Sequence, residues 1–247
     1  MYNPFQLIGK TILVTGASSG IGRATAIESS KLGAKLVITG RNRERLQQTL
    51  DYLCGDGHIA IVADLSTEEG IISLVGQLPI LDGVVNSAGI TITCPIPFIK
   101  QEDMDRVFSI NTFAPILLTK YLLKKKKINK DASIVFISSV ATDTFAPGNT
   151  VYGITKSAIK TFCEYCALEV AHKGIRVNSI HPGMVNTEMT RNLSFSKEDL
   201  DIDKSKYPIQ RYAEPEEIAF SVIYLLSDAT KWMTGTQLVI DGGVHLI

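Results

Sequence analysis

Short apolar runs alternate with longer amphipathic stretches along the whole chain. Runs that are rich in β-branched residues and bounded by Gly, Asp, Asn or Ser predict strands buried on both faces. They are Thr11–Thr15, Lys35–Thr39, His58–Val62, Leu81–Val85, Ser133–Ile137, Arg176–Ile180 and Gln237–Ile240. The segments between them have helical spacing of apolar residues, which predicts helices over Ile21–Leu32, Arg43–Leu53, Ser66–Gln77, Gln101–Leu123, Val151–Lys173 and Pro215–Leu226.

This alternation predicts an α/β fold, a doubly wound and mostly parallel sheet of about seven strands with helices on both faces. No Pro/Gly/Ser-rich linker interrupts the pattern, so we expect one domain over residues 1–247. Ligands of such sheets bind outside the carboxyl ends of the strands. The polar, poorly periodic segment Thr187–Tyr212 is long for a loop, and we expect it to form a mobile substrate cap over that edge.

Composition narrows the class of protein. Of 247 residues, 45% are hydrophobic and 20% charged, as in folded proteins. The 25 basic and 25 acidic residues balance to a net charge of zero, which gives no long-range field for nucleic acid or an anionic membrane. No apolar stretch approaches the length of a membrane span, and Met1–Lys10 lacks the pattern of a signal peptide, so we expect a cytoplasmic protein.

The cysteines and histidines give no metal or disulfide pattern. Cys163 and Cys166 form a C-x-x-C pair inside a predicted helix, where small core side chains are the favoured interpretation and a redox motif the alternative. Cys54 and Cys94 stand alone, and His58, His172, His181 and His245 have no ligand spacing. We therefore expect no metal, and we interpret His181 as structural.

A glycine-rich turn follows the first predicted strand. It reads Thr-Gly-Ala-Ser-Ser-Gly-Ile-Gly from Thr15 to Gly22, and a helix follows it. Glycines permit a tight turn that approaches a pyrophosphate closely, and the helix N-terminus presents unpaired N–H groups and a partial positive charge. In this position the turn predicts nucleotide binding.

The turn is one of several motifs that occur in a fixed order. It has the form T-G-x-x-x-G-x-G, and further along come Asn86-Ser-Ala-Gly89, Ser139, Tyr152-Gly-Ile-Thr-Lys156, Pro182-Gly183 with Thr187, and Asp241-Gly-Gly243. Together these motifs resemble the single-domain branch of the short-chain dehydrogenase/reductase family, with Ser87 in place of an Asn. Pro208–Arg211 and Pro215–Ala219 are most similar to segments of β-ketoacyl-acyl-carrier-protein reductases. The resemblance implies a Rossmann domain that transfers hydride with a nicotinamide cofactor.

The resemblance also implies which residues bind the cofactor. Gly40 stands where NAD-preferring members carry an acid, and Arg41 follows it, so we expect NADP(H), with Arg41 pairing with the 2′-phosphate. The alternative is that Arg41 is a solvated surface charge. Asp64 is either an adenine contact or a helix N-cap. The expected cofactor residues are Gly16, Ser18, Ser19, Gly20, Ile21, Gly22, Arg41, Asp64, Leu65, Asn86, Ala88, Gly89, Tyr152, Lys156, Pro182, Gly183, Val185 and Thr187.

The predicted reaction chemistry rests on Tyr152 and Lys156. They are four residues apart and share one helix face. A tyrosine has a pKa near 10, and a nearby ammonium or oxidised nicotinamide would lower it. Tyr152 is then a general acid for a carbonyl that receives hydride, and a general base in the reverse direction. Ser139 would donate to the same oxygen. By resemblance, Lys156 also bonds the nicotinamide ribose.

Asn111 completes the predicted catalytic set. Pro115 lies four residues after it and removes the partner of its backbone carbonyl if the helix continues. We expect a kink there, with the freed carbonyl holding a water that bonds Lys156, the role the family assigns to this asparagine. A proline that only shapes packing is the alternative.

The leading hypothesis is an NADP(H)-dependent reductase of a small-molecule or carrier-bound ketone. Its finer form is a 3-oxoacyl-acyl-carrier-protein reductase. The alternatives are a reductase of another small ketone such as a sugar or steroid, and a non-catalytic nucleotide-sensing or scaffold protein on the same fold. Lys124–Lys127, Lys130 and Lys173 would be a carrier-binding patch or a solvated helix end. The resemblance implies a homo-oligomer, a tetramer or else a dimer. Its candidate interface residues are Phe113, Phe162 and Cys166.

Overall fold

The seven predicted strands form one sheet. The structure is a computed structural model that describes residues 3–191 and 196–246. Within these residues, seven parallel strands form one sheet in the order β3-β2-β1-β4-β5-β6-β7. The strands are β1 Thr11–Thr15, β2 Lys35–Gly40, β3 Ile59–Val62, β4 Leu81–Asn86, β5 Ile128–Ile137, β6 Arg176–Pro182 and β7 Gln237–Ile240. β5 begins five residues before its predicted start, and its first residue pairs with Leu81 of β4.

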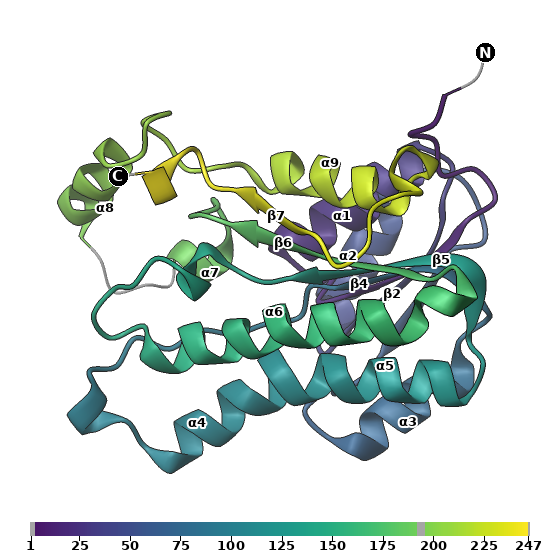
Figure 1. The fold of residues 1–247 in the computed structure, drawn as a ribbon, viewed down its shortest axis with the longest axis horizontal. Coiled ribbons are helices and arrows are strands. Elements are labelled where there is room, and N and C mark those ends of the chain that lie inside the picture. Colours follow the sequence, from purple (N-terminus) through teal and green to yellow (C-terminus); the bar gives the residue numbers. More distant parts are fainter. Residues whose placement is uncertain (1–2, 192–195, 247) are drawn as a thin grey trace.

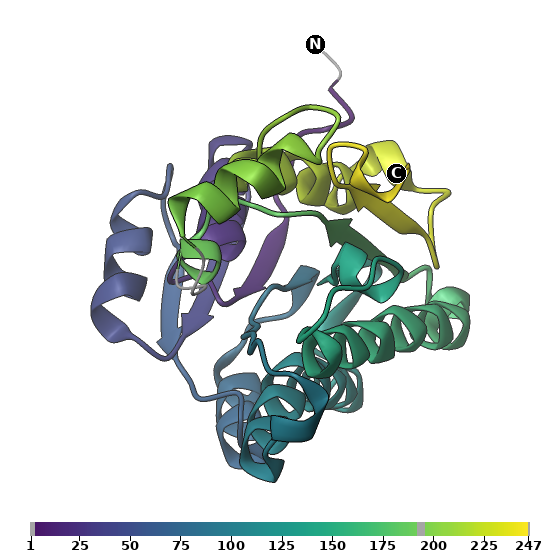
Figure 2. The ribbon, with the colours of Figure 1, turned by 90° about the vertical axis from the view of Figure 1, so that its left-hand side faces the viewer.

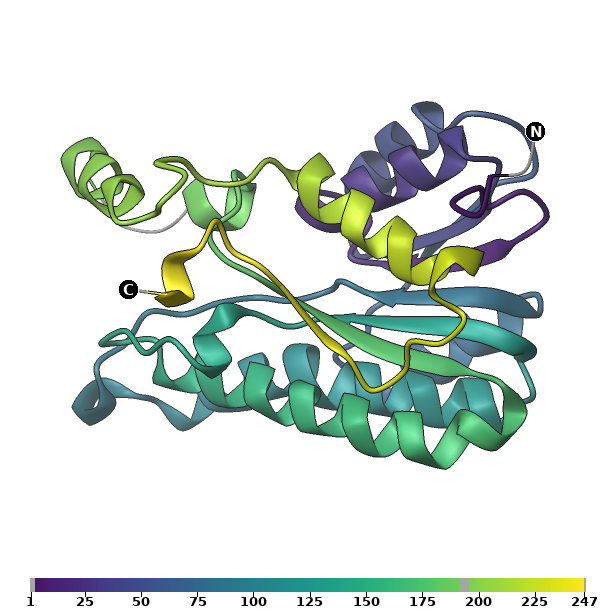
Figure 3. The same ribbon diagram turned by 45° about the horizontal axis from the view of Figure 1, so that its top comes forward.

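Helices cover both faces of the sheet (Figure 1). One face carries α1, α2 and α9, and the other carries α3, α4, α5 and α6 (Figure 3). The helices are α1 Gly20–Lys31, α2 Arg43–Asp51, α3 Glu68–Gln77, α4 Gln101–Phe108, α5 Ala114–Lys124, α6 Thr150–Val170, α7 Glu188–Arg191, α8 Lys197–Ser205 and α9 Pro215–Leu226. The predicted α/β fold with a doubly wound sheet is confirmed.

The strands are apolar on both sides because each face of the sheet packs against helices. Leu13 of β1 points into the core with α3, α5 and α6, whereas its neighbours Ile12 and Val14 point into the core with α1, α2 and α9. All three side chains are fully buried. Successive side chains of a strand point to opposite faces, so a strand between two helical layers needs apolar residues at every position.

The predicted helix Gln101–Leu123 is interrupted. A π-helical turn over Ser109–Phe113 separates α4 from α5, and Pro115 lies in the first turn of α5. Proline lacks the N–H that a continuous helix needs, and a π-turn lets the backbone pass that position. The kink predicted at Asn111 is therefore present.

Strand order reverses direction between β1 and β4. The chain moves from β1 out to β3 and then returns to place β4 on the other side of β1. The carboxyl ends of these two strands lie at the crevice where such sheets bind ligands. Short helices from the expected cap, α7 and α8, lie over this edge (Figure 2). The cap segment therefore contains helices where its sequence pattern suggested an irregular loop.

Candidate active site

A cleft of about 1310 Å³ opens at the carboxyl ends of the strands. Its floor is the junction of the turns after β1 and β4. The hydroxyl of Thr15 accepts hydrogen bonds from the backbone N–H groups of Ser87 and Ala88, each at 3.1 Å. Gly16 has φ +66°, and a Cβ there would lie 2.8 Å from the backbone of Ala88. Only glycine allows the two turns to approach this closely.

The glycine turn leads directly into the N-terminus of α1. A Cβ on Gly22 would lie 2.5 Å from the carbonyl oxygen of Gly16, so a side chain there would push the turn out of shape. The N-cap residue Ser19 makes no side-chain capping bond, and the first turn of α1 has no acidic residue. Unpaired N–H groups and the helix dipole therefore face the cleft, as binding of a phosphate requires.

The end of the cleft beside β2 is basic. Gly40, Arg41, Asn42 and Arg45 line it, and the side chain of Asn42 caps α2 by accepting from the N–H of Arg45 at 2.9 Å. Arg45 also forms an ion pair with Glu188 of α7 at 2.5 Å, which links the cap to α2. These cations at the end of β2 match the charge of a phosphate on the adenosine ribose.

Asp64 does not line the cleft formed by the described residues. Its carboxylate accepts hydrogen bonds from the N–H and hydroxyl of Ser66, which lower its pKa, and the charge of Arg41 lowers it further. The N-cap of α3 is Thr67, so the alternative interpretation of Asp64 as that helix's N-cap is wrong. Its neighbour Leu65 lines the cleft.

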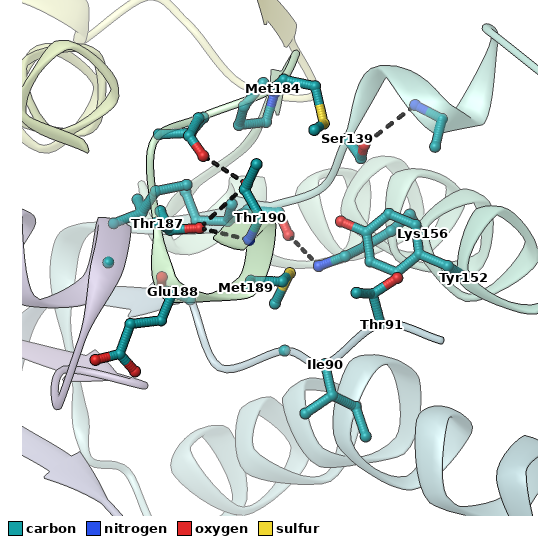
Figure 4. Close-up of a pocket in the computed structure, with 18 of the residues that line it drawn as sticks. Ile90, Thr91, Ser139, Tyr152, Lys156, Met184, Thr187, Glu188, Met189 and Thr190 are labelled. Atoms are coloured by element: carbon teal, nitrogen blue, oxygen red, sulfur yellow. Dashed lines mark hydrogen bonds between the residues drawn. The ribbon is translucent and has the colours of Figure 1, made fainter. Parts of the chain in front are cut away.

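Ser139, Tyr152 and Lys156 come together at the other end of the cleft (Figure 4). Ser139 follows β5, and the other two side chains project from the first turns of α6. The ammonium of Lys156 lies 5.6 Å from the centroid of the Tyr152 ring and donates to the carbonyl of Ile137 at 2.8 Å. Lys156 is 5% exposed, and burial lowers its pKa to about 8.

The expected lowering of the Tyr152 pKa by Lys156 is not found. Burial raises the pKa of the phenol, and the hydroxyl of Ser139 opposes that rise. Burial of the phenol outweighs the hydrogen bond from Ser139, and the ammonium of Lys156 donates to the backbone carbonyl of Ile137 at the end of β5. The raised pKa keeps the proton on Tyr152 at neutral pH, which is the state required of an acid.

Asn111 is buried behind the cleft and does not line it within the described part of the chain. Its side-chain amide accepts from the N–H of Ile90 and donates to the carbonyl of Ile90, both at 2.9 Å. It also donates to the hydroxyl of Thr155 on α6 at 3.1 Å. The side chain of Asn111 therefore ties the loop after β4 to α6. The sequence prediction concerned only the backbone carbonyl of Asn111 and did not include this contact.

The opposite wall of the cleft comes from the segment after β6. Met184 and Met189 point into the cleft beside Thr187 and Thr190 (Figure 4). The hydroxyl of Tyr207 accepts a hydrogen bond from the backbone N–H of Met184 at 3.1 Å. This contact ties the segment after β6 to the residues that follow α8 in the cap.

Most of the predicted site residues line this one cleft. They are Gly16, Ser18, Ser19, Gly20, Ile21, Gly22, Arg41, Leu65, Ala88, Gly89, Ser139, Tyr152, Lys156, Pro182, Gly183, Val185 and Thr187. Asn86 lies beneath the floor, 6% exposed, and its Nδ2 has no hydrogen-bond partner among the described residues. Sequence reasoning missed Arg45, Glu188, Met184 and Met189. Arg45 and Glu188 are 143 residues apart in the sequence, so no local sequence pattern predicts their ion pair.

Other candidate features lie away from the cleft. Cys163 and Cys166 are buried in the core, and burial raises their pKa values to about 12 and about 11, which excludes a reactive thiolate. Lys124–Lys127 end α5 at the edge where β5 begins, whereas the cleft lies where β5 ends. A ten-residue strand is about 33 Å long, so these lysines lie far from the cleft. This distance favours their interpretation as a solvated helix end over a carrier-binding patch.

The described residues contain neither a metal-binding cluster nor a membrane-spanning helix. Across residues 3–191 and 196–246, no group of three or more His, Cys, Asp or Glu side chains is placed to hold a metal ion. In the same part of the chain, no helix has the length and apolar character needed to span a membrane.

Comparisons with known proteins cover nearly the whole chain. A family model described as Enoyl-(Acyl carrier protein) reductase matches residues 16–245. The 3-oxoacyl-acyl-carrier-protein reductase FabG of Rickettsia felis is 34% identical over 242 residues, which cover 98% of this chain and 99% of that protein. L-xylulose reductase of Caenorhabditis elegans is 36% identical over 250 residues, which cover 97% of each.

A solved structure matches the fold over nearly the whole chain. It is described as an NAD(P)-dependent gluconate 5-dehydrogenase of Beutenbergia cavernae with bound NADP. It matches with a TM-score of 0.91 and 30% sequence identity, over 99% of this chain and 100% of that one. The match extends through the glycine turn, the strand ends and α6, which build the cleft.

Proposed function

The chain belongs to the short-chain dehydrogenase/reductase family, and on that premise we propose that it reduces a ketone to a secondary alcohol with NADPH, with Tyr152 as the proton donor. As a member of this family it is an oxidoreductase that acts on CH–OH and C=O groups. One observation carries the proposal. A single cleft has an anion-binding helix N-terminus at one end and the side chains of Ser139, Tyr152 and Lys156 at the other.

The cleft fits a dinucleotide. At Gly16 and Gly22 the turn packs so closely against neighbouring backbone that a Cβ at either position would clash. The two glycines thereby leave space in front of the N-terminus of α1. Bound there, NADPH would supply the hydride. The glycine turn would hold its pyrophosphate, and Pro182, Gly183, Val185 and Thr187 would line its nicotinamide end.

Tyr152 is the residue suited to move the proton. Its raised pKa keeps the phenol protonated at neutral pH, so it can donate to a carbonyl oxygen as negative charge develops there. Ser139 donates to the same oxygen and holds the substrate. Lys156, with a pKa of about 8, carries its charge at neutral pH and gives up a proton readily. Asn111 keeps the wall opposite these residues in place through Ile90.

The preference for NADPH rests on Arg41. It lines the cleft immediately after Gly40, where no carboxylate follows β2 to repel a phosphate. Arg45, also on the cleft, is already paired with Glu188, so Arg41 is the cation proposed to meet the phosphate. The solvated-charge alternative for Arg41 is disfavoured by its place on this wall.

An acyl thioester is the substrate class that the cleft mouth favours. Phe145 and Ile202, which line the cleft, are 87% and 61% exposed, and Met184 and Met189 lie inside it. This apolar path suits a hydrocarbon chain. A ketose is the second candidate, because Thr91, Thr93 and Asn149 also line the cleft and offer partners for sugar hydroxyls. The names of the two curated relatives correspond to these two classes.

We also propose a cytoplasmic homo-oligomer, a tetramer or else a dimer. Phe113 at the start of α5 is 53% exposed, and Ile154 and Leu168 of α6 are 52% and 78% exposed. A second copy would cover these apolar side chains. Cys166 is buried in the core of one chain, whereas Phe162 is half-buried against that core and stays an interface candidate. Light scattering of the purified protein measures the oligomeric state.

A ketone panel tests the proposed reaction. The purified chain is mixed with NADPH and with acetoacetyl-coenzyme A, an acyl-carrier-bound 3-oxoacyl thioester, L-xylulose or 5-ketogluconate, and the loss of NADPH absorbance is followed. Tyr152→Phe should lower kcat by about 10²–10⁴-fold and leave NADPH binding intact. Tyr165→Phe is the matched control, because Tyr165 lies on the same helix and is 65% exposed. Normal NADPH binding without turnover of any ketone would favour the sensing alternative.

A further inference from the structure

His181 is a buried histidine that touches the catalytic serine. It lies near the end of β6, is 1% exposed, and directs both ring nitrogens at polar partners. Nδ1 lies 3.2 Å from the carbonyl oxygen of Ser139 and 3.3 Å from the hydroxyl of Thr142. Nε2 lies 2.9 Å from the hydroxyl of Ser179. Sequence reasoning set this residue aside because Tyr152 already supplies the acid–base chemistry.

The partners fix the tautomer of the ring. The carbonyl of Ser139 can only accept, so Nδ1 must carry the proton. In a neutral imidazole Nε2 is then an acceptor, and the hydroxyl of Ser179 donates to it. Burial lowers the pKa of His181, with the charges of Lys160 and Lys156 acting in the same direction, so the ring is neutral at neutral pH. Both nitrogens are thus used, and neither is free to exchange a proton with substrate.

The turn that carries Ser139 begins where β5 leaves the sheet. The N–H of Ser138 still donates to the carbonyl of Ile180 at 2.8 Å and its hydroxyl to the carbonyl of Lys156 at 3.1 Å, and Ser139 follows in extended backbone at φ −168°. Its own hydroxyl accepts from the N–H of Ala141 at 3.1 Å, and Thr142 donates to its carbonyl at 3.0 Å. The last two bonds arise within the same short turn. His181 ties that turn to the neighbouring strand.

We propose that His181 is a positioning residue for catalysis: its Nδ1–H holds the carbonyl of Ser139 so that the serine hydroxyl faces the reacting oxygen beside Tyr152. This inference rests on the proposed function, because it assigns a role within the same reaction. A fixed donor matters here because a misplacement of about 1 Å at a catalytic group costs up to about 100-fold in rate. The ring also explains why polar residues are retained in this buried part of β6.

Two amide substitutions distinguish the role of Nδ1 from that of Nε2. His181→Asn places its amide nitrogen near the position of Nδ1 and keeps a donor for Ser139. His181→Gln places its amide near Nε2, keeps a partner for Ser179, and loses that donor. With NADPH and acetoacetyl-coenzyme A, the Gln variant should lose about tenfold or more in kcat with an unchanged dissociation constant for NADPH, and the Asn variant should recover most of that loss.

A double-mutant cycle tests whether the effect passes through Ser139. In a Ser139→Ala background, His181→Gln should change kcat less than about twofold, because the hydroxyl to be positioned is absent. The control is Asn178→Ala on the same strand, which removes buried bonds to Met233 and Thr236 far from the serine. It should lower the melting temperature and leave kcat near that of the wild type. An equal loss from His181→Gln in both backgrounds would overturn the inference.

A crystal structure of His181→Gln gives a readout that does not depend on turnover. The Ser139 hydroxyl should move away from the Tyr152 hydroxyl relative to the wild type, and in His181→Asn it should stay. If the wild type reduces no ketone, the proposed function fails, but this displacement still decides the role of His181. An unmoved serine in the Gln variant would overturn it.

Discussion

Replacing Lys156 with Met should remove a pH dependence of folding that only a desolvated lysine produces. The ammonium of Lys156 is 5% exposed, and burial lowers its pKa from 10.5 to about 8. Between these two values the unfolded chain holds the proton and the folded chain does not. Stability therefore rises as the pH rises through this window, and below about pH 8 the penalty for burying the charge is fully present.

The size of the effect follows from the shift. A shift of about 2.5 units corresponds to about 3 kcal/mol of unfavourable free energy at pH 7, and about 1.3 kcal/mol of it should be released between pH 7 and pH 9. A comparison of wild-type and Lys156→Met stability at a single pH contains a second effect. The substitution also leaves the carbonyl of Ile137 without its donor, which costs about 1–3 kcal/mol. The difference in pH dependence is unaffected by that constant cost.

Urea unfolding followed by circular dichroism at pH 7, 8 and 9 measures this difference. Wild-type stability minus that of Lys156→Met should rise by about 1.3 kcal/mol across the series. The subtraction cancels Cys163, Cys166 and Tyr207, whose raised pKa values act in the opposite direction above pH 9. Lys130→Met, on the exposed start of β5, should follow the wild type. Parallel curves for the wild type and Lys156→Met would refute the desolvation of Lys156.

Two further predictions concern the cofactor end of the cleft. Gly22→Ala brings a Cβ within 2.5 Å of the Gly16 carbonyl, so it should weaken NADPH binding about tenfold or more and destabilise the fold by about 1–3 kcal/mol. Gly76→Ala, where no atom lies within 4 Å, is the control in calorimetry and fluorescence titration, and wild-type affinity in Gly22→Ala would contradict the prediction. Arg41→Ala should raise the KM for NADPH about 10–100-fold and leave the KM for NADH unchanged. Equal changes for both cofactors in steady-state kinetics would show that Arg41 does not meet the 2′-phosphate.

The sheet was predictable from the sequence because its strands are sandwiched. A strand such as β1, with Leu13 packed on one face and Ile12 and Val14 on the other, appears as a continuous apolar run. The helices follow from ordinary apolar spacing. The kink at Asn111 was predictable because Pro115 removes one specific N–H. The boundaries of β5 were missed because its first residues, Ile128–Lys130, are half-buried or exposed and carry little apolar signal.

The contacts of the site were harder to predict than its members. The motifs identified Ser139, Tyr152 and Lys156, but the pKa of Tyr152 is raised because its side chain is buried, and spacing alone does not show that burial. Nor does spacing show that the ammonium of Lys156 donates to the carbonyl of Ile137. The contacts of His181 could not be predicted for the same reason, since Nδ1 faces the backbone carbonyl of Ser139, just beyond β5, and a backbone carbonyl is not visible in a residue pattern. The helices of the cap were missed because α7 is one turn long and α8 is strongly polar.

The two parts of the cleft are held by different elements. The reacting residues are tied within the sheet and α6, where the ammonium of Lys156 donates to the carbonyl of Ile137 and the hydroxyl of Ser138 donates to the carbonyl of Lys156. The cap is tied to α2 by the Arg45–Glu188 ion pair and to the segment after β6 by the hydroxyl of Tyr207, which accepts from the N–H of Met184. Changes in the cap therefore leave the proton-transfer geometry intact. Substrate choice is accordingly expected to follow the cap residues and not the motifs.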